Sequence, residues 1–288
     1  MSSWLTSRGL SRRDVLKGLA AVSVGTATGA GAHGYLYERH RVDVTREVLY
    51  VSGLPEPLDG LRVGFMTDLH RSSLVPHELI TSAAGLLMAE QPDLILLGGD
   101  YVTWGGDYLA AGDRHFVGLA AEAVSGLSAP YGVFGVLGNH DDDREMPTAM
   151  AARGVEILKD ARTRLTVRGE ALDLIGIRYW TTRGRDIASV ARGAAKASIL
   201  LAHNPWRLKE AAALSLPLML SGHTHGGQIV LPGLGAIAAR NFPIVAGQGS
   251  RANTTAFVSR GVGTIYVPIR INCPPEVAVL TLKPASQA

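Results

Sequence analysis

The chain alternates between two patterns of apolar and polar positions from about residue 61 onward. Short apolar runs, typical of buried β-strands, occur at residues 61–66, 93–97, 133–137, 198–202 and 216–220. Segments with apolar residues at helical spacing separate or follow these runs, at residues 76–90, 115–127, 145–153, 187–195 and 205–213. Strands that alternate with helices in this way predict an α/β fold.

Other parts of the chain add strands of a different kind. Residues 164–168 and 172–177 flank Gly169-Glu170 and predict a β-hairpin, and residues 256–259 and 277–282 are strand-like. Hairpins bring antiparallel pairs, so the predicted sheet structure is mixed. Since no linker composition occurs after residue 60, we expect residues 33–60 to form a linker and first strand and residues 61–288 to form one domain.

Each of the five apolar runs is followed at once by Asp, Asn or His. The side chains at these five strand ends are, in chain order, Asp68 and His70, Asp100, Asn139, His203, and His223 with His225. In open α/β sheets, binding sites gather beyond the carboxyl ends of the strands. Distant parts of the chain are therefore expected to deliver these side chains to one cleft.

The chemistry of this set is that of a metal centre. Carboxylate, imidazole and amide groups without a thiolate suit divalent Mn, Fe, Zn, Co or Ni. Seven ligands are too many for one tetrahedral ion but suit two ions that share a carboxylate. Considered alone, Asp68 is also typical of a turn and His203 of a surface histidine. Five apolar strands that each end in Asp, Asn or His in one chain favour the metal centre.

The motifs, in this order, resemble those of the calcineurin-like metallophosphoesterase superfamily. They are Asp-x-His at Asp68, Gly-Asp at Asp100, Gly-Asn-His-Asp at 138–141, a lone His203, and Gly-His-x-His at 222–225, within residues 45–283. The resemblance implies a four-layer α/β/β/α sandwich of two mixed β-sheets flanked by helices. It also implies a metal-dependent phosphoric ester hydrolase with a binuclear metal centre.

The resemblance further implies a division of the ligands. One ion would be held by Asp68, His70, Asp100 and His225, and the other by Asp100, Asn139, His203 and His223, with Asp100 bridging. His140 and Asp141 are the predicted catalytic residues: His140 would protonate the leaving oxygen or donate to the phosphoryl group, oriented by Asp141. The alternative for His140 is a purely supporting place beside the ligands.

Some positions depart from the superfamily pattern. Thr103 stands where a second Asp is frequent, and Asp141 stands where phosphoprotein phosphatases have Glu, which speaks against a protein phosphatase. Residues 58–62 and 268–275 resemble a branch of exported or membrane-associated bacterial phosphodiesterases. We therefore expect a phosphodiesterase that uses a metal-bridging hydroxide; the alternatives are a UDP-2,3-diacylglucosamine-type pyrophosphatase and a non-catalytic envelope protein that binds metal or phosphate.

The N-terminus predicts export. Residues 1–32 contain Arg12-Arg13, an uncharged segment from Gly18 and the small-x-small site Ala30–Ala32, which resembles a twin-arginine (Tat) signal. The predicted partner is the Tat machinery, and the predicted location is the periplasm, cell wall or outer face of the cytoplasmic membrane. Cleavage after Ala32 is favoured, although an uncut segment is long enough to associate with a membrane.

Composition limits the other partners. Residues 1–32 carry four basic and one acidic residue, so the remaining 24 basic and 24 acidic residues cancel, and no nucleic-acid binding is expected. The single Cys273 excludes an internal disulfide and is expected to be structural. Arg71 is predicted either to contact phosphate or to lie in solvent. Residues 103–114 and 231–251 are the expected substrate loops for a phosphoester, with lipid- or envelope-linked esters among the candidates.

Overall fold

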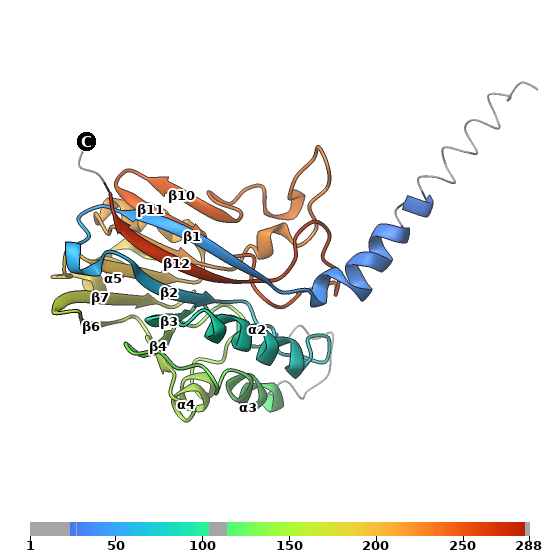
Figure 1. Cartoon of the computed structure of the whole chain (residues 1–288), viewed down its shortest axis with the longest axis horizontal. Coiled ribbons are helices and arrows are strands. Elements are labelled where there is room, and N and C mark those ends of the chain that lie inside the picture. Colours follow the sequence, from blue (N-terminus) through green and yellow to red (C-terminus); the bar gives the residue numbers. More distant parts are fainter. Residues whose placement is uncertain (1–23, 27, 104–113, 286–288) are drawn as a thin grey trace, which may run out of the picture.

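The chain folds into two six-stranded sheets packed face to face, with helices on both outer sides (Figure 1). The computed structural model describes residues 24–26, 28–103 and 114–285. Most of the predicted signal segment, residues 1–23 and 27, lies outside the described residues. The described helices are α2 His77–Ala89, α3 Arg114–Ala123, α4 Glu145–Ala151, α5 Gly184–Ala191 and α6 Leu208–Ala213.

The first sheet has the strand order β1-β12-β2-β3-β4-β5. Its strands are β1 Asp43–Val51, β2 Leu61–Met66, β3 Leu94–Leu97, β4 Val133–Gly135, β5 Glu156–Ile157 and β12 Glu276–Pro284. Strands β2 to β5 run parallel, and β12 pairs antiparallel with β2 and parallel with β1. The first strand of the predicted 33–60 segment is β1, which joins the C-terminal strand at the edge of the sheet.

The second sheet has the order β10-β11-β9-β8-β7-β6. Its strands are β6 Ala161–Val167, β7 Glu170–Ile177, β8 Ser198–Ala202, β9 Leu218–Ser221, β10 Gly247–Arg251 and β11 Thr254–Val258. Strands β7, β8, β9 and β11 are parallel, and hairpins add β6 and β10 at the two edges. Both sheets are mixed, as predicted.

Three apolar layers hold this arrangement together. Between the sheets, the rings of Phe65 and Phe257 meet edge to face with centroids 6.4 Å apart. A second cluster joins the first sheet to α2, α3 and α4, and a third joins the second sheet to α5 and α6. Strands such as β8 are therefore buried on both faces, which explains their uninterrupted apolar sequence. The predicted four-layer α/β/β/α sandwich is confirmed.

Several element boundaries differ from the predictions for local reasons. The hairpin turn is Arg168-Gly169 rather than Gly169-Glu170, because both turn residues have positive φ (51° and 86°), as a two-residue type I′ turn requires. The helix predicted from residue 205 begins as a separate 3-10 turn, Pro205–Arg207. The Asn204 side chain accepts from Trp206 N at 3.0 Å and starts that turn.

The N-terminal part of the described chain is attached to the C-terminal region. Residues 28–36 are helical, Gly34 O accepts from Arg270 N at 3.3 Å, and Glu38 Oε1 accepts from Cys273 N at 2.6 Å. The helix leaves the sandwich at the end toward which β2 runs (Figure 1). Within the described ranges, no helix is both long and apolar enough to cross a bilayer.

Candidate metal centre

All predicted ligands follow parallel strands at one end of the sandwich. Asp68 and His70 follow β2, Asp100 follows β3, and Asn139 follows β4 in the first sheet. His203 follows β8, and His223 with His225 follows β9 in the second sheet. Because the sheets pack face to face, the two sets of strand ends open onto the same cleft, as the geometry of open parallel sheets predicts.

The backbone at the ligands is unusual. Five predicted ligands have φ in the left-handed region, which non-glycine residues rarely occupy: Asp68 (53°), His70 (47°), Asp100 (55°), His223 (75°) and His225 (52°). Such conformations cost on the order of 1–3 kcal/mol each and gather where function requires a particular side-chain direction. Five of the thirteen non-glycine residues with positive φ in the described part of the chain are predicted ligands, which is consistent with a functional site at this strand edge.

The side chains form two groups of candidate metal ligands. Asp68, His70 and His225 present ligand atoms within 4.8 Å of one another, and so do Asp100, His203 and His223. Within the first group, His70 Nε2 lies 3.1 Å from His225 Nε2, and within the second, His203 Nε2 lies 3.1 Å from His223 Nδ1. Convergent imidazole nitrogens are the arrangement that a divalent cation requires.

Asp100, a member of the second group, also lies close to His70 of the first group. Its Oδ2 lies 3.1 Å from His203 Nε2 and 3.6 Å from His70 Nε2. Asn139 Oδ1 is buried without a hydrogen-bond partner among the described residues, and Asn139 lines the same cavity. An unpartnered buried amide oxygen beside a carboxylate is the donor that a second ion would use. The nitrogen and oxygen atoms of these two groups therefore suit divalent-metal binding.

Burial sets the protonation of the histidines. Burial and the neighbouring His225 lower the pKa of His70 to about 3, and burial and His203 lower the pKa of His223 to about 4. Burial followed by the charge of Arg270 holds the pKa of His225 well below its ordinary value. These three rings are neutral at pH 7 and offer lone pairs, the form that ligates metals.

His203 behaves in the opposite way. Burial alone would lower its pKa, but the negative charges of Asp100 and Asp68 outweigh burial and raise it to about 10. The same proximity holds the pKa of Asp100 well below its ordinary value, against the effect of burial. In the metal-free protein these two groups form an ion pair, so a cation that binds here displaces the proton of His203.

Groups behind the ligands fix their orientation. His203 Nδ1 lies 2.8 Å from Gly98 O, which directs Nε2 toward Asp100. Thr67 Oγ1 donates to Asp68 Oδ2 at 2.7 Å. Thr103, the position where members of the superfamily often have Asp, lies with Oγ1 3.2 Å from His70 Nδ1.

Of the predicted catalytic pair, His140 lies at the cavity, whereas Asp141 is buried and does not line it. His140 lines the cavity, its backbone N–H donates to Asp100 Oδ1 at 2.9 Å, and its ring lies edge-on to His70 at 5.1 Å. Both carboxylate oxygens of Asp141 accept backbone N–H groups, from Asp100 (2.8 Å), Tyr101 (2.7 Å) and Gly138 (2.8 Å). Asp141 therefore connects the loop of Asp100 to the loop of Asn139 through hydrogen bonds. That Asp141 also orients His140 stays a prediction.

Burial and the charge of Asp100 raise the pKa of Asp141 to about 7, while the N–H donors oppose the shift. Arg71 lies elsewhere: its guanidinium donates to the carbonyls of Ser72 and Val75 and lies over the Phe116 ring, 4.9 Å from its centroid. Arg71 Nη1 therefore makes its hydrogen bonds to backbone carbonyls of its own loop, and Arg71 is not among the residues that line the cavity, which disfavours the phosphate-contact alternative.

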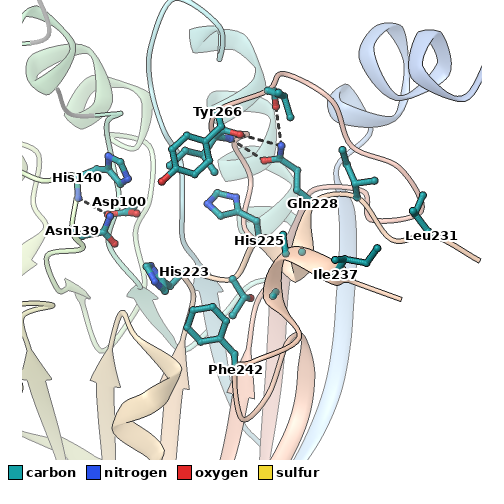
Figure 2. A pocket seen from close by; sticks show the side chains of 17 residues that line it. Asp100, Asn139, His140, His223, His225, Gln228, Leu231, Ile237, Phe242 and Tyr266 are labelled. Atoms are coloured by element: carbon teal, nitrogen blue, oxygen red, sulfur yellow. Dashed lines mark hydrogen bonds between the residues drawn. The ribbon is translucent and has the colours of Figure 1, made fainter. Parts of the chain in front are cut away.

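A cavity of about 480 Å³ adjoins the centre. Figure 2 shows Asp100, Asn139 and His140 on one side of it and Leu231 and Ile237 on the other, with His223 and His225 between. Phe242 meets the His223 ring at 5.4 Å, and Tyr179, outside the cavity lining, lies 5.3 Å from the same ring. Phe242 falls in the predicted substrate loop 231–251; nothing in the sequence pattern indicated Tyr179.

The fold and the donor set define a metal-dependent phosphoester hydrolase, and comparison with known proteins identifies its family. Residues 61–227 match the family described as calcineurin-like phosphoesterase, which covers more than half of the chain. The chain belongs to the calcineurin-like phosphoesterases. This confirms the resemblance inferred from the five motifs.

Two relatives extend the similarity over nearly the whole chain. Phosphodiesterase YaeI of Escherichia coli (strain K12) is 30% identical over 95% of this chain and 99% of its own. Metallophosphoesterase YkuE of Bacillus subtilis (strain 168) is 29% identical over 95% of this chain and 98% of its own. Among solved structures, the NAD nucleotidase of Haemophilus influenzae is 12% identical with a TM-score of 0.48 over 70% of this chain and 50% of its own.

Proposed function

We propose that this phosphoester hydrolase is a phosphodiesterase that works with two divalent ions and acts outside the cytoplasm. The observation that carries the proposal is that Asp100 belongs to one group of convergent ligands and also lies close to His70 of the other. A single-ion site would leave one of these groups and the buried Asn139 oxygen without a purpose. The similarity to a phosphodiesterase over nearly its full length supports diesters as the substrate.

The residues divide as the superfamily pattern implies. Asp68, His70 and His225 would hold one ion, and His203, His223 and Asn139 the other, with Asp100 shared. When bound, such a pair lowers the pKa of water to make a nucleophile near neutral pH and neutralises phosphoryl oxygens. The ligands are nitrogen and oxygen atoms without a thiolate, which suits Mn as well as Fe, Zn, Ni or Co.

His140 would supply the proton for the departing oxygen. Its backbone N–H is fastened to Asp100 and its ring packs on His70, so the imidazole is held at the cavity wall beside the ligands. General-acid catalysis is worth about 10²–10⁴-fold when the leaving group is basic. His140→Ala is therefore expected to lose that factor on an alkyl diester but much less on a p-nitrophenyl ester, whose leaving oxygen needs no proton. Equal losses on both esters would refute the acid role.

The test of the proposal is turnover of bis-p-nitrophenyl phosphate by the purified, Mn²⁺-loaded protein. Asp100→Ala should abolish turnover and lower the metal content, while Asp186→Ala, a partly exposed carboxylate at the start of α5, should leave both unchanged. Metal binding without turnover with Mn, Zn, Ni, Co or Fe would favour the binding-protein alternative. Release of nucleoside monophosphate from a nucleotide sugar, without diester turnover, would favour the pyrophosphatase alternative.

Export rests on the Arg12-Arg13 motif and the uncharged segment that follows it. The full chain should be recovered outside the cytoplasm, in the periplasm, cell wall or at the outer face of the cytoplasmic membrane. Replacing Arg12-Arg13 with Lys-Lys should hold it in the cytoplasm without changing its activity. Mass determination of the exported form decides whether the chain is cut after Ala32. Export that is indifferent to the Lys-Lys change would refute the Tat proposal.

A further inference from the structure

The cavity beside the ligands has one wall made almost entirely of hydrocarbon. We define the apolar wall as the cavity-lining residues Ile229, Leu231, Ile237, Phe242, Ile265 and Val267. Figure 2 shows Leu231 and Ile237 on the side of the cavity away from Asn139 and His140. Two segments build it, the loop after His225 and the segment before Arg270. The wall is continuous with the ligand cluster, so whatever group leaves the phosphorus, or remains on it, must lie against hydrocarbon.

Gln228, which lines the cavity next to the wall, already uses its side-chain amide in hydrogen bonds within the protein. Gln228 Nε2 donates to the carbonyls of Ile265 (3.1 Å) and Val267 (2.8 Å), and its Oε1 accepts from Ile265 N at 2.9 Å. These bonds join the two segments and use the amide fully in holding the wall. A ligand therefore cannot exchange hydrogen bonds with Gln228 without separating the segments, and the wall offers it apolar contacts instead.

The distribution of charged side chains around the cavity also favours an uncharged organic group in the ligand. Among the described residues that line it, none is Lys or Arg, and the only carboxylate is the ligand Asp100. A second phosphate group would find no cation beyond the ions themselves, which disfavours nucleotides and diphosphates. One phosphodiester charge at the ions, with an uncharged organic group beyond them, is the ligand that this charge distribution fits.

Several large side chains of the wall, or next to it in the chain, are exposed to solvent. Leu231 is 37% exposed, Leu234 70% and Tyr266 88%, and Ile237 and Val267 are also exposed. Exposed apolar side chains that gather at a cavity mouth mark a surface that binds apolar matter. Since Gly34 is hydrogen-bonded to Arg270, the N-terminal helix, with exposed Leu36, leaves from the same region.

We propose that the organic part of the substrate is an aliphatic chain that lies along the apolar wall while the phosphodiester reaches the ions. The inference rests on the proposed function and adds to it the class of substrate: amphiphilic phosphodiesters with one phosphate. The mouth, with its exposed Leu234 and Tyr266, would receive the chain from micelles or lipid surfaces or from solution alike, because the wall recognises the hydrocarbon.

The test compares two diesters that share one leaving group and one charge. The full chain loaded with Mn²⁺ is assayed on methyl and octyl p-nitrophenyl phosphate, both below the micelle concentration. Each buried methylene is worth about a fourfold gain in binding, so burial of three or four predicts an octyl-to-methyl ratio of kcat/KM of about 100. Thymidine p-nitrophenyl phosphate, with a polar organic group, should resemble the methyl ester.

Matched variants locate the effect. Leu231→Ser should lower the ratio about tenfold, whereas Leu86→Ser, on the exposed face of α2 and equally exposed at 38%, should leave it unchanged. Leu231→Met, which keeps the hydrocarbon, should retain most of the ratio. Ile237→Ser provides a second reduction in case the Leu231 loop does not fold in the serine variant.

The outcomes separate the inference from the function on which it rests. A ratio near one with good turnover of both esters overturns the aliphatic chain and leaves the phosphodiesterase intact. A high ratio that Leu231→Ser and Ile237→Ser leave unchanged also overturns it. If neither ester is turned over, calorimetry with methyl- and octylphosphonate applies: tighter octyl binding supports the apolar wall while the enzymatic proposal fails, and equal binding refutes both.

Discussion

Gly138→Ala is a one-carbon change that tests whether the position of Asp100 matters. A Cβ at residue 138 would lie 2.0 Å from Asp100 Oδ1, 2.7 Å from Asp100 Cγ and 2.6 Å from Asp100 N. Real Cβ atoms essentially never approach another heavy atom within 3.0 Å, so Asp100 must move by about 1 Å. A rotamer change does not relieve the clash, because one of the atoms is backbone.

The magnitude follows from what Asp100 contacts. A shift of about 1 Å lengthens the 3.1 Å approach to His203 and the 2.9 Å hydrogen bond from His140 N. Misplacement of this size in an active site costs about 10² in rate, whereas overpacking costs about 1–3 kcal/mol of stability. We therefore expect a folded protein with about 1% of the original kcat/KM and reduced metal content.

The assay measures three quantities on the same preparation. Turnover of bis-p-nitrophenyl phosphate gives kcat/KM, elemental analysis gives metal per chain, and urea unfolding gives stability. Gly85→Ala is the matched control, since Gly85 lies in α2 and a methyl group added there would meet nothing within 4 Å. Alanine there should stabilise the helix by about 0.5–1 kcal/mol and leave activity unchanged.

Full activity and full metal content in Gly138→Ala would refute the reasoning, because Asp100 would then tolerate displacement. A loss of activity that matches a complete loss of folding would also count against it, since the clash was expected to act on the site first. An equal loss in Gly85→Ala would show that the two changes act through something other than Asp100.

Three further outcomes are expected. Asn139→Ala should lower the metal content toward one ion per chain by elemental analysis, because it removes the unpartnered buried oxygen. Asp173→Asn should cost about 1–2 kcal/mol in urea unfolding, because the buried carboxylate accepts from Arg164 at 2.7 and 2.8 Å and from Ala195 N at 2.7 Å, while the Arg164 side chain is about half exposed; no measurable loss would contradict this. The metal-free protein should be most stable near pH 6.5. Burial lowers the pKa of His70 to about 3 and that of His223 to about 4, so below pH 6.5 these two histidines bind protons in the unfolded chain but not in the folded protein. Asp141, with a pKa of about 7, binds one extra proton in the folded protein and offsets only one of these two. The stability of the folded protein therefore rises with pH in this range. Above pH 6.5, His203 keeps its proton in the folded protein, where its pKa is about 10, but loses it in the unfolded chain. The stability of the folded protein therefore falls as the pH rises toward 10. A stability in EDTA that rises steadily from about pH 5 to about pH 9 in urea unfolding would refute this balance.

The strand ends were predictable because their signal is local. A buried parallel strand must be apolar throughout, so a polar residue placed soon after it, such as Asp100 after β3, stands out in the sequence. The convergence of the ends then follows from the geometry of parallel strands rather than from any property of the loops. For that reason the set of candidate ligands could be predicted from the strand ends, whereas their division into two groups came from the resemblance to the calcineurin-like superfamily.

The edges of the sheets were harder to predict. β1 carries charged residues at Asp43, Arg46 and Glu47, none of them buried, so its sequence resembles a linker. What makes it a strand is parallel pairing with β12, more than two hundred residues away in the chain. β10, of sequence Gly247–Arg251, likewise has no apolar pattern of its own and is defined by its pairing with β11. Tertiary pairing overrides local preference at such edges.

The residues of the apolar wall could not be predicted from the sequence pattern, for a different reason. Its residues come from irregular segments, in which neither a two-residue nor a 3.6-residue period tells which side chains face inward. Ile237 and Val267 become neighbours of one cavity through the three hydrogen bonds of Gln228. The backbone hydrogen bonds between residues 228–230 and Ile271 join the same two segments, so these tertiary contacts, which no sequence periodicity records, help to shape the surface.

Arg270 shows how the ligand cluster and the apolar wall depend on each other. Its guanidinium is fully buried and donates to the carbonyls of Arg260, Gly261, Gly263 and Cys273. A Cβ on Gly261 would lie 2.6 Å from Asp68 Cβ, so the loop that Arg270 holds packs directly against a metal ligand. The same charge lowers the pKa of His225 and so favours its neutral, ligating form. Because Arg270 also ends the segment that contributes Ile265 and Val267, one buried cation couples the state of the ligands to the position of the wall.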